Sequence, residues 1–217
     1  MKKHIWLLAV GLLAFAGCFH MNGIKGSGVR KTEKRDVNSF KSIETNGAYE
    51  IDVDCQKPLG LEIEADDNIL PLVKTDVRDG VLYITNAQPY RSQKLVVLKI
   101  TLPDLERITS NGAGNFKVVN LKNDAFEVHS TGATSFNAAG QTKSVKIESS
   151  GAGKIETSNL RAEKASVSIS GAASVDVFAS DQLDVNLSGV GRVSYSGNPK
   201  TVNKNVSGVG SVSAKGS

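Results

Sequence analysis

Histidine and cysteine supply many catalytic and metal sites, and this chain of 217 residues contains only three histidines and two cysteines. Outside the first 20 residues, a Ser-His-Asp system or a histidine-based metal site would have to use His129 alone. No HxxxH or CxxC spacing is present. We therefore expect His129 to be a solvated side chain on a β-strand. We predict no catalytic residues, no metal site and no cofactor.

Carboxylates offer a second kind of chemistry, because a cluster of them can bind Ca²⁺ and a sugar chain. Glu156 and Asp176 each stand five residues after a glycine of a repeated pattern, so stacked repeats would place one directly above the other. Stacked like charges are unfavourable unless a cation or a basic side chain neutralises them. Lys154, two residues before Glu156, can do so. We therefore favour a neutralised pair over a cation or glycan site at Glu156 and Asp176.

The first residues have the pattern of an export signal. A basic start precedes an apolar run from Ile5 to Ala16, which predicts a secretory signal peptide over residues 1–17. The segment Phe15-Ala-Gly-Cys18 resembles the bacterial lipobox, although Leu is usual where Phe15 stands. This resemblance implies that cleavage leaves Cys18 as a lipid-modified amino terminus, which would attach the protein to the membrane. An ordinary signal peptide followed by a chance cysteine is the alternative.

Removal of the signal changes the charge of the chain. Lys2 and Lys3 leave with it, so the formal net charge falls from +4 to +2 and we expect no nucleic-acid partner. Phe19 follows Cys18, where Asp would favour the inner membrane in the sorting pattern, so the outer membrane is expected. With Cys18 acylated, Cys55 has no disulfide partner and is interpreted as a buried, inert thiol.

Residues 18–35 combine glycines with basic side chains and lack apolar periodicity. Such a segment predicts a flexible, lipid-anchored tether. Its cations either contact anionic lipid headgroups or are simply solvated.

A repeat of about 19 residues organises the rest of the chain. Seven Ser/Thr/Asn-Gly-Ala/Val triplets are centred on Gly47, Gly112, Gly132, Gly151, Gly171, Gly189 and Gly208. The residue four positions after each glycine is apolar, and so is the residue four positions before it, except at Lys204. Further apolar residues follow at alternate positions, which is the pattern of β-strands.

Each repeat is therefore predicted as strand, glycine corner, strand. We expect the corner to require glycine because its φ is positive, and the Ala or Val that follows to turn inward. One such unit cannot bury its own apolar face, so successive copies must stack. An all-β, parallel β-helix with turns of about 19 residues is thus favoured over an antiparallel sandwich, whose hairpins would not keep one glycine phase.

A single domain is predicted over residues 36–217, with regular repeats in residues 106–217. Residues 36–105 are less regular and are interpreted as the opening of the same solenoid. We expect strands near residues 59–64, 80–85 and 94–102, a tight turn at Asp79-Gly80, and one helical turn within residues 67–72.

The lipoprotein-type leader, the segment Asp36-Val-Asn-Ser-Phe-Lys-Ser-Ile43, the segment Asn46-Gly-Ala-Tyr-Glu-Ile51 and the serial glycine corners together resemble the auto-transporter adhesin head GIN domain family. The resemblance covers nearly all of residues 36–217. It implies a right-handed parallel β-helix related in shape to pectin-lyase-like folds, exported or attached to the bacterial surface. It also implies a role in adhesion, and it supplies no catalytic residues.

These features lead to a non-enzymatic lipoprotein of the cell envelope that acts in adhesion, scaffolding or binding of a surface ligand. An enzyme or binding module acting on polysaccharides is the alternative. The expected partners are the membrane, an envelope protein or a surface glycan. The last strand, ending near Ala214, is expected to present a free edge that supports weak self-association, with Lys204 and Lys215 limiting such pairing.

Overall fold

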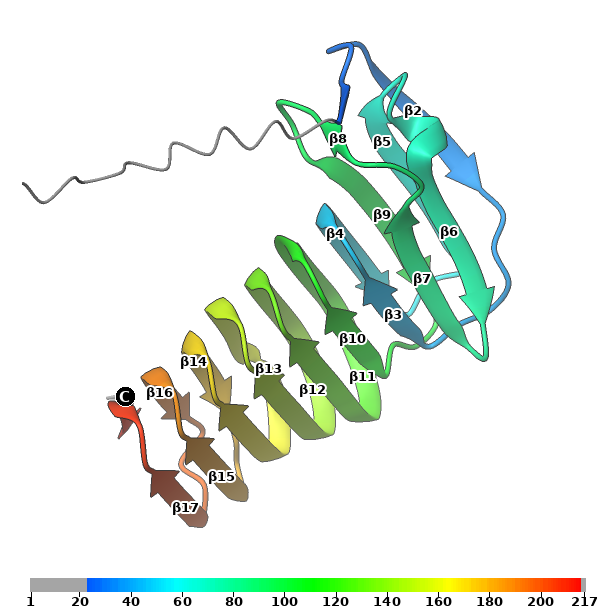
Figure 1. The fold of residues 1–217 in the computed structure, drawn as a ribbon. Coiled ribbons are helices and arrows are strands. Elements are labelled where there is room, and N and C mark those ends of the chain that lie inside the picture. Colours follow the sequence, from blue (N-terminus) through cyan, green and yellow to red (C-terminus); the bar gives the residue numbers. More distant parts are fainter. Residues whose placement is uncertain (1–22, 216–217) are drawn as a thin grey trace, which may run out of the picture.

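Parallel strands stacked about 20 residues apart build the body of the molecule (Figure 1). The computed structural model describes residues 23–215, so the predicted signal peptide, Cys18 and His20 lie outside the described residues. Within residues 23–215 the only helical segment is the 3-10 turn η1 (Leu70–Leu72), which confirms the turn expected there. The fold is the all-β solenoid that the repeat predicted.

Nine strands form the regular repeats. They are β10 (Arg107–Ser110), β11 (Ala113–Ser130), β12 (Ala133–Ser149), β13 (Ala152–Ile169), β14 (Ala172–Phe178), β15 (Gln182–Leu187), β16 (Val190–Ser196), β17 (Thr201–Val206) and β18 (Val209–Ala214). Each long strand follows one face of the solenoid, bends through a register shift, and returns along the other face. Asn120 and Gly140 have positive φ values of 58° and 140° at these bends.

The core consists of columns of equivalent apolar residues, one from each turn. The column four residues after the glycines pairs Phe116 with Ile51 on one side and with Phe136 on the other. It continues through Ile155, Val175, Val193 and Val212. The rings of Phe116 and Phe136 are stacked with centroids 6.1 Å apart. In-register stacking therefore buries side chains that no single repeat could bury alone.

Close approach of successive turns, rather than backbone conformation, explains the corner glycines. Of the seven, only Gly47 has a positive φ, at 150°, so the expected reason is wrong for the other six. A Cβ on Gly132 would lie 1.6 Å from the carbonyl oxygen of Gly112, and one on Gly151 would lie 2.0 Å from that of Gly132. That oxygen accepts a hydrogen bond from the amide of Ala152 at 2.9 Å. Any side chain at the corner would break this contact between turns.

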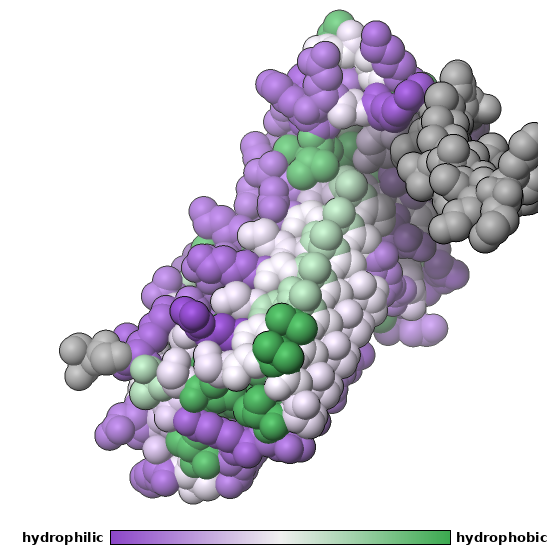
Figure 2. All heavy atoms as spheres, turned by 60° about the vertical axis from the view of Figure 1, so that its left-hand side comes forward, coloured by the Kyte–Doolittle hydropathy of each residue, from purple (hydrophilic) through white to green (hydrophobic). Residues whose placement is uncertain are grey.

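The small residue after six of the seven corner glycines is exposed and points outward, not inward as expected, and Ala48 after Gly47 is half-buried. Ala113, Ala133, Ala152 and Ala172 are exposed, and Val190 and Val209 are 58% and 74% exposed. Figure 2 shows a narrow green column along one edge of the solenoid, next to a pale surface of intermediate hydropathy. The inward positions are instead the alternate residues that begin two places after the glycine, such as Thr134 and Phe136 after Gly132.

The amino-terminal part adds antiparallel strands to the first parallel turns. Its strands are β1 (Ile24–Lys25), β2 (Arg30–Arg35), β3 (Ser42–Thr45), β4 (Ala48–Cys55), β5 (Gly60–Asp66), β6 (Val73–Arg78), β7 (Val81–Asn86), β8 (Tyr90–Arg91) and β9 (Val96–Leu102). Strand β4 is parallel to β11 and to β9, while β5 is antiparallel to β9 and to β2. Strands β6 and β7 form a hairpin, and Asp79 and Gly80 make the turn with positive φ, as predicted.

The structure corrects the predicted tether over its described residues, 23–35. Strand β2 pairs with β5 along its whole length, and β1 pairs with β8. The Arg35 guanidinium donates hydrogen bonds to the carbonyl oxygens of Leu70 and Val73, at 3.1 and 2.7 Å. Local composition concealed this strand because its partners lie about 30 residues further along the chain.

We expect Gly151→Ala to destabilise the fold by about 1–3 kcal/mol, because its Cβ would force the stacked backbones apart. Urea unfolding followed by circular dichroism measures the change. Ser150→Ala, at the neighbouring exposed position, is the matched control and is expected to stay within about 0.5 kcal/mol of the parent. Equal stability of Gly151→Ala and the parent would contradict the close-approach explanation.

Candidate functional site

The carboxylates singled out in the sequence do stack, and each has its own lysine. Glu156 in β13 pairs with Asp176 in β14. Lys154 Nζ lies 2.5 Å from Glu156 Oε1, and Lys215 Nζ lies 2.9 Å from Asp176 Oδ2. The hydrogen bond to Glu156 raises the pKa of Lys154, so its positive charge is retained. This arrangement supports a neutralised pair rather than a cation site.

His129, predicted from the sequence to be a solvated strand residue, lies partly exposed on β11 and takes part in a charge network with two glutamates. Its Nδ1 lies 2.8 Å from Glu148 Oε2, and its Nε2 lies 3.3 Å from Glu127 Oε2. Arg107 Nε contacts Glu127 at 2.7 Å, and Lys146 Nζ contacts Glu148 at 2.7 Å. Charges of alternating sign therefore cross β10, β11 and β12, which is the favourable arrangement for cross-strand neighbours.

Ionisation of the two glutamates follows from these partners. The hydrogen bond from Arg107 lowers the pKa of Glu127, and the hydrogen bond from Lys146 lowers that of Glu148. Both carboxylates are thus held in the charged form that binds the cations. The network therefore links neighbouring strands on this face. Both of its carboxylates are paired, so neither is available as a general acid.

Other chemistry is sparse in the described part of the chain. Residues 23–215 contain no group of three or more His, Cys, Asp or Glu side chains placed to hold a metal ion. Burial raises the pKa of the Cys55 thiol to about 12, so the thiolate needed for nucleophilic attack is scarce at neutral pH. No helix within residues 23–215 has the length and apolar character of a membrane span.

A groove of 380 Å³ crosses β13, β15 and β17 on the same face as the charge network. We call it the amide groove; its polar outward residues are Ser166, Ser168, Asp184, Asn186, Asn203 and Asn205. Asn203 Nδ2 donates to Asp184 Oδ1 at 2.7 Å, and Asn205 Nδ2 contacts Asn186 Oδ1 at 3.4 Å. Each amide keeps further donor or acceptor capacity for a ligand.

Three partly exposed aromatic rings are covered by cations. Arg78 lies 4.6 Å from the ring centroid of Tyr83, Arg161 lies 4.3 Å from that of Phe178, and Lys204 Nζ lies 5.0 Å from that of Tyr195. A ligand cannot stack on these faces without displacing the cation. Recognition in the amide groove would therefore rely on hydrogen bonds.

The sequence reasoning missed the amide groove, although a signal for it was present. The outward positions three and five residues before each glycine are mostly charged or ionisable in the earlier turns, as at Glu127 and His129, with Ser42 and Thr109 as the exceptions. They become mostly hydroxyl and amide residues from Ser166 onward. Lys215 could not be assigned from the sequence, because it reaches Asp176 from 39 residues away.

Together the fold and the surface define a rigid β-solenoid that presents polar faces and has its stacked carboxylates neutralised. The family model described as "Putative auto-transporter adhesin, head GIN domain" matches residues 39–199. The chain belongs to this family, as its motifs suggested. A search of the curated proteins found no match.

Solved structures share the fold. A putative adhesin from Bacteroides fragilis is 23% identical, with a TM-score of 0.71, covering 89% of this chain and 100% of its own. A putative adhesin from Parabacteroides merdae is 20% identical with a TM-score of 0.57, and a putative lipid binding protein from Parabacteroides distasonis is 18% identical with a TM-score of 0.53. Both of these alignments cover 89% of this chain and 99% of the other. At these identities the likeness establishes the fold.

The charge network predicts acid sensitivity. A carboxylate whose pKa is lower in the folded state stabilises the fold above its unfolded-state value, near 4.5, and this contribution is lost as the pH falls through the folded-state value. We expect Glu127→Gln/Glu148→Gln to lower the unfolding free energy at neutral pH by up to about 1 kcal/mol, since exposed pairs are weak. The difference from the parent should shrink well below pH 4.5.

Urea unfolding of the parent and the double variant, at neutral pH and at a pH well below 4.5, measures this effect. Glu163→Gln removes an exposed carboxylate outside the network and serves as the control. A difference between the double variant and the parent that is the same at both pH values would show that the network does not act through these ionisations.

Proposed function

We propose that this protein is a non-enzymatic, lipid-anchored adhesin of the bacterial cell envelope, facing the periplasm or the cell surface from the outer membrane. The observation that carries the proposal is the amide groove, a line of hydroxyl, amide and carboxylate groups on a rigid sheet. Membership of an adhesin-type family supports a surface or envelope role. The ligand class that fits best is a surface glycan.

The groove suits a glycan because sugar hydroxyls both donate and accept hydrogen bonds. Asparagine offers both functions in one side chain, and serine hydroxyls rotate to suit either. Outward residues of successive turns stand about 4.8 Å apart, so one extended chain can meet several turns at once. Because the backbone is fixed by the sheet, little ordering entropy is lost on binding.

The proposed anchor is a lipid on Cys18. A thioether-linked lipid hides its acyl chains in the bilayer and leaves the solenoid in the aqueous phase. Export before modification agrees with the apolar run of the leader and with the Gly-Cys pair that ends it.

We expect cells fed radiolabelled palmitate to label the protein, and Cys18→Ala to abolish the label and move the protein from the detergent phase to the aqueous phase on Triton X-114 partition. Cys55→Ala is the matched control and should remain labelled, because Cys55 is buried within β4. Labelling that persists in Cys18→Ala would rule out this anchor.

We expect Asn186→Ala/Asn205→Ala to weaken glycan binding about tenfold, since two ligand hydrogen bonds are lost at roughly 0.5–1.5 kcal/mol each. A glycan array identifies the ligand, and biolayer interferometry then measures affinity. Asn115→Ala/Asn137→Ala removes two amides from β11 and β12, outside the groove and on the opposite face of earlier repeats, and should leave affinity unchanged.

Two outcomes would contradict this proposal. Absence of glycan binding by the parent, with capture of an envelope protein instead, would assign the groove to protein docking. Polysaccharide depolymerisation that is abolished in Glu156→Gln/Asp176→Asn would instead make the protein an enzyme.

A further inference from the structure

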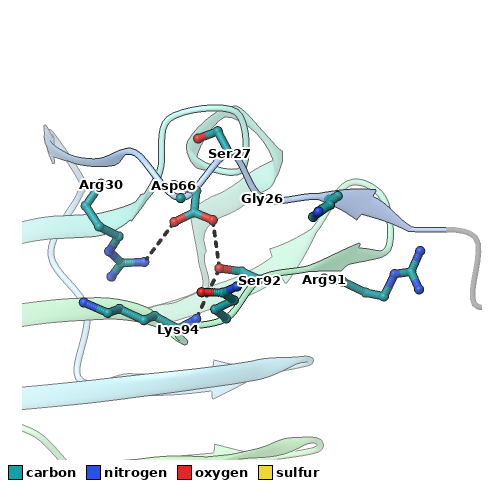
Figure 3. Close-up of a pocket in the computed structure, with 10 residues that line it drawn as sticks. Gly26, Ser27, Arg30, Asp66, Arg91, Ser92 and Lys94 are labelled. Atoms are coloured by element: carbon teal, nitrogen blue, oxygen red, sulfur yellow. Dashed lines mark hydrogen bonds and ion pairs between the residues drawn. The ribbon is translucent and has the colours of Figure 1, made fainter.

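A basic pocket lies at the amino-terminal end of the solenoid, away from the amide groove. It has a volume of 650 Å³ and is formed by the segment Lys25–Arg30, the segment Arg91–Lys94 and Asp66. Figure 3 shows Ser27 above Asp66 and Ser92 below it, with Arg30 and Lys94 on one side and Gly26 and Arg91 on the other.

The segments around this pocket are fixed. The amides of Ile24 and Gly26 donate to the carbonyl oxygens of Pro89 and Arg91, at 3.0 and 2.8 Å. Gly26 passes so close to Asp66 that a Cβ would lie 1.9 Å from its Oδ2. The pocket is therefore preformed by two strands and their hydrogen bonds, and ligand binding would cost little ordering.

Positive charge exceeds negative charge in the pocket. Lys25, Arg30, Arg91 and Lys94 line it, against the single carboxylate of Asp66. That carboxylate is occupied, since Ser92 Oγ donates to Oδ2 at 2.9 Å and Arg30 Nη1 lies 3.8 Å from Oδ1. Within residues 23–215, Lys25, Arg91 and Lys94 form no ion pair. The pocket thus has three positive charges to offer an anion.

Arg30 provides a further donor. Its Nε binds Glu64 Oε1 at 3.1 Å, and its Nη2 binds the carbonyl oxygens of Glu64 and Leu95. Its Nη1 is buried and makes no hydrogen bond within the described residues. A buried donor without an acceptor is costly, and an anion entering the pocket would satisfy it.

Apolar side chains are exposed around the same end. Val29 is 55% exposed, and Ile24 and Leu95 are each 36% exposed. They flank the cations in sequence, next to Lys25, Arg30 and Lys94. Cations interleaved with exposed aliphatic residues suit the interface of an anionic bilayer, where headgroup phosphates meet the first methylenes.

The number of residues between Cys18 and the first described residue limits how far the basic pocket can lie from the proposed lipid anchor. Five residues, 18–22, separate the membrane-inserted lipid from Gly23. Fully extended, they span about 17 Å. The basic pocket must then lie close to the bilayer, whereas a tether that extended to residue 35 would have left it free.

We propose that the basic pocket docks on the membrane surface and binds the phosphate of an anionic phospholipid headgroup. The proximity argument rests on the proposed anchor at Cys18, while the pocket's own chemistry does not. Docking would orient the solenoid, with β1 and β8 at the bilayer and the amide groove carried away from it by the intervening turns (Figure 1).

The test uses the chain from residue 19 onward, which lacks the lipidated cysteine and retains every described residue. Co-sedimentation with phosphatidylcholine vesicles, with and without phosphatidylglycerol, measures the partition coefficient. We expect binding only to the anionic vesicles. Lys25→Gln/Arg91→Gln/Lys94→Gln should lower the partition coefficient roughly 100-fold, since each surface cation contributes roughly a fivefold gain.

Lys117→Gln/Lys122→Gln/Lys164→Gln removes the same charge from exposed positions on β11 and β13 and should bind as the parent does. An equal loss of vesicle binding in both triple variants would show that net charge alone explains the binding, and it would overturn the proposal that the pocket docks on the membrane. Binding of inorganic phosphate, followed by NMR, without binding to vesicles would assign the pocket to a soluble anion and overturn membrane docking. Because the tested chain lacks Cys18, these results do not depend on lipidation, so failure of membrane docking can be distinguished from failure of the proposed lipid anchor.

Discussion

Backbone contact between successive turns at the glycine corner is the constraint on which the rest of this structure depends. The carbonyl oxygen of each corner glycine except the last accepts a hydrogen bond from the amide that follows the next corner glycine, as from Ala133 to Gly112 at 3.0 Å. A side chain would occupy the position of that oxygen. With the corner fixed, the residues of one turn lie over their equivalents in the next, apart from the register shifts at the bends, and the apolar columns form the core.

The same register controls the surface. Because equivalent residues are brought into adjacent rows, like charges would face one another unless partners intervened. The network around His129 and the Lys154–Glu156 pair are such solutions. Where the outward residues become amides and hydroxyls, the sheet no longer needs internal neutralisation. The amide groove is therefore the part of this face with spare hydrogen-bonding capacity.

The amino-terminal end is not built from stacked repeats. Antiparallel strands β2 and β5 cover the first parallel turns, and Arg30 and Arg35 fasten β2 to distant carbonyl oxygens. Because β1 and β2 are paired in the sheets, only a short segment separates the folded body from Cys18, and cations are gathered at this end of the solenoid. A membrane-facing end and a ligand-facing groove would thus occupy separate parts of one rigid body, which suits an adhesin whose ligand must be reached beyond the bilayer.

The repeat alone determined the solenoid, the register and the pairing of Glu156 with Asp176, because these depend on periodicity along the chain. Residues far apart in sequence decided the remainder. Lys215 reaches Asp176 across two turns, β2 finds its partner in β5, and the basic pocket joins residues near 25 and 92. Such contacts carry no periodic signal, since each is made once. Only the folded chain brings these groups within hydrogen-bonding distance.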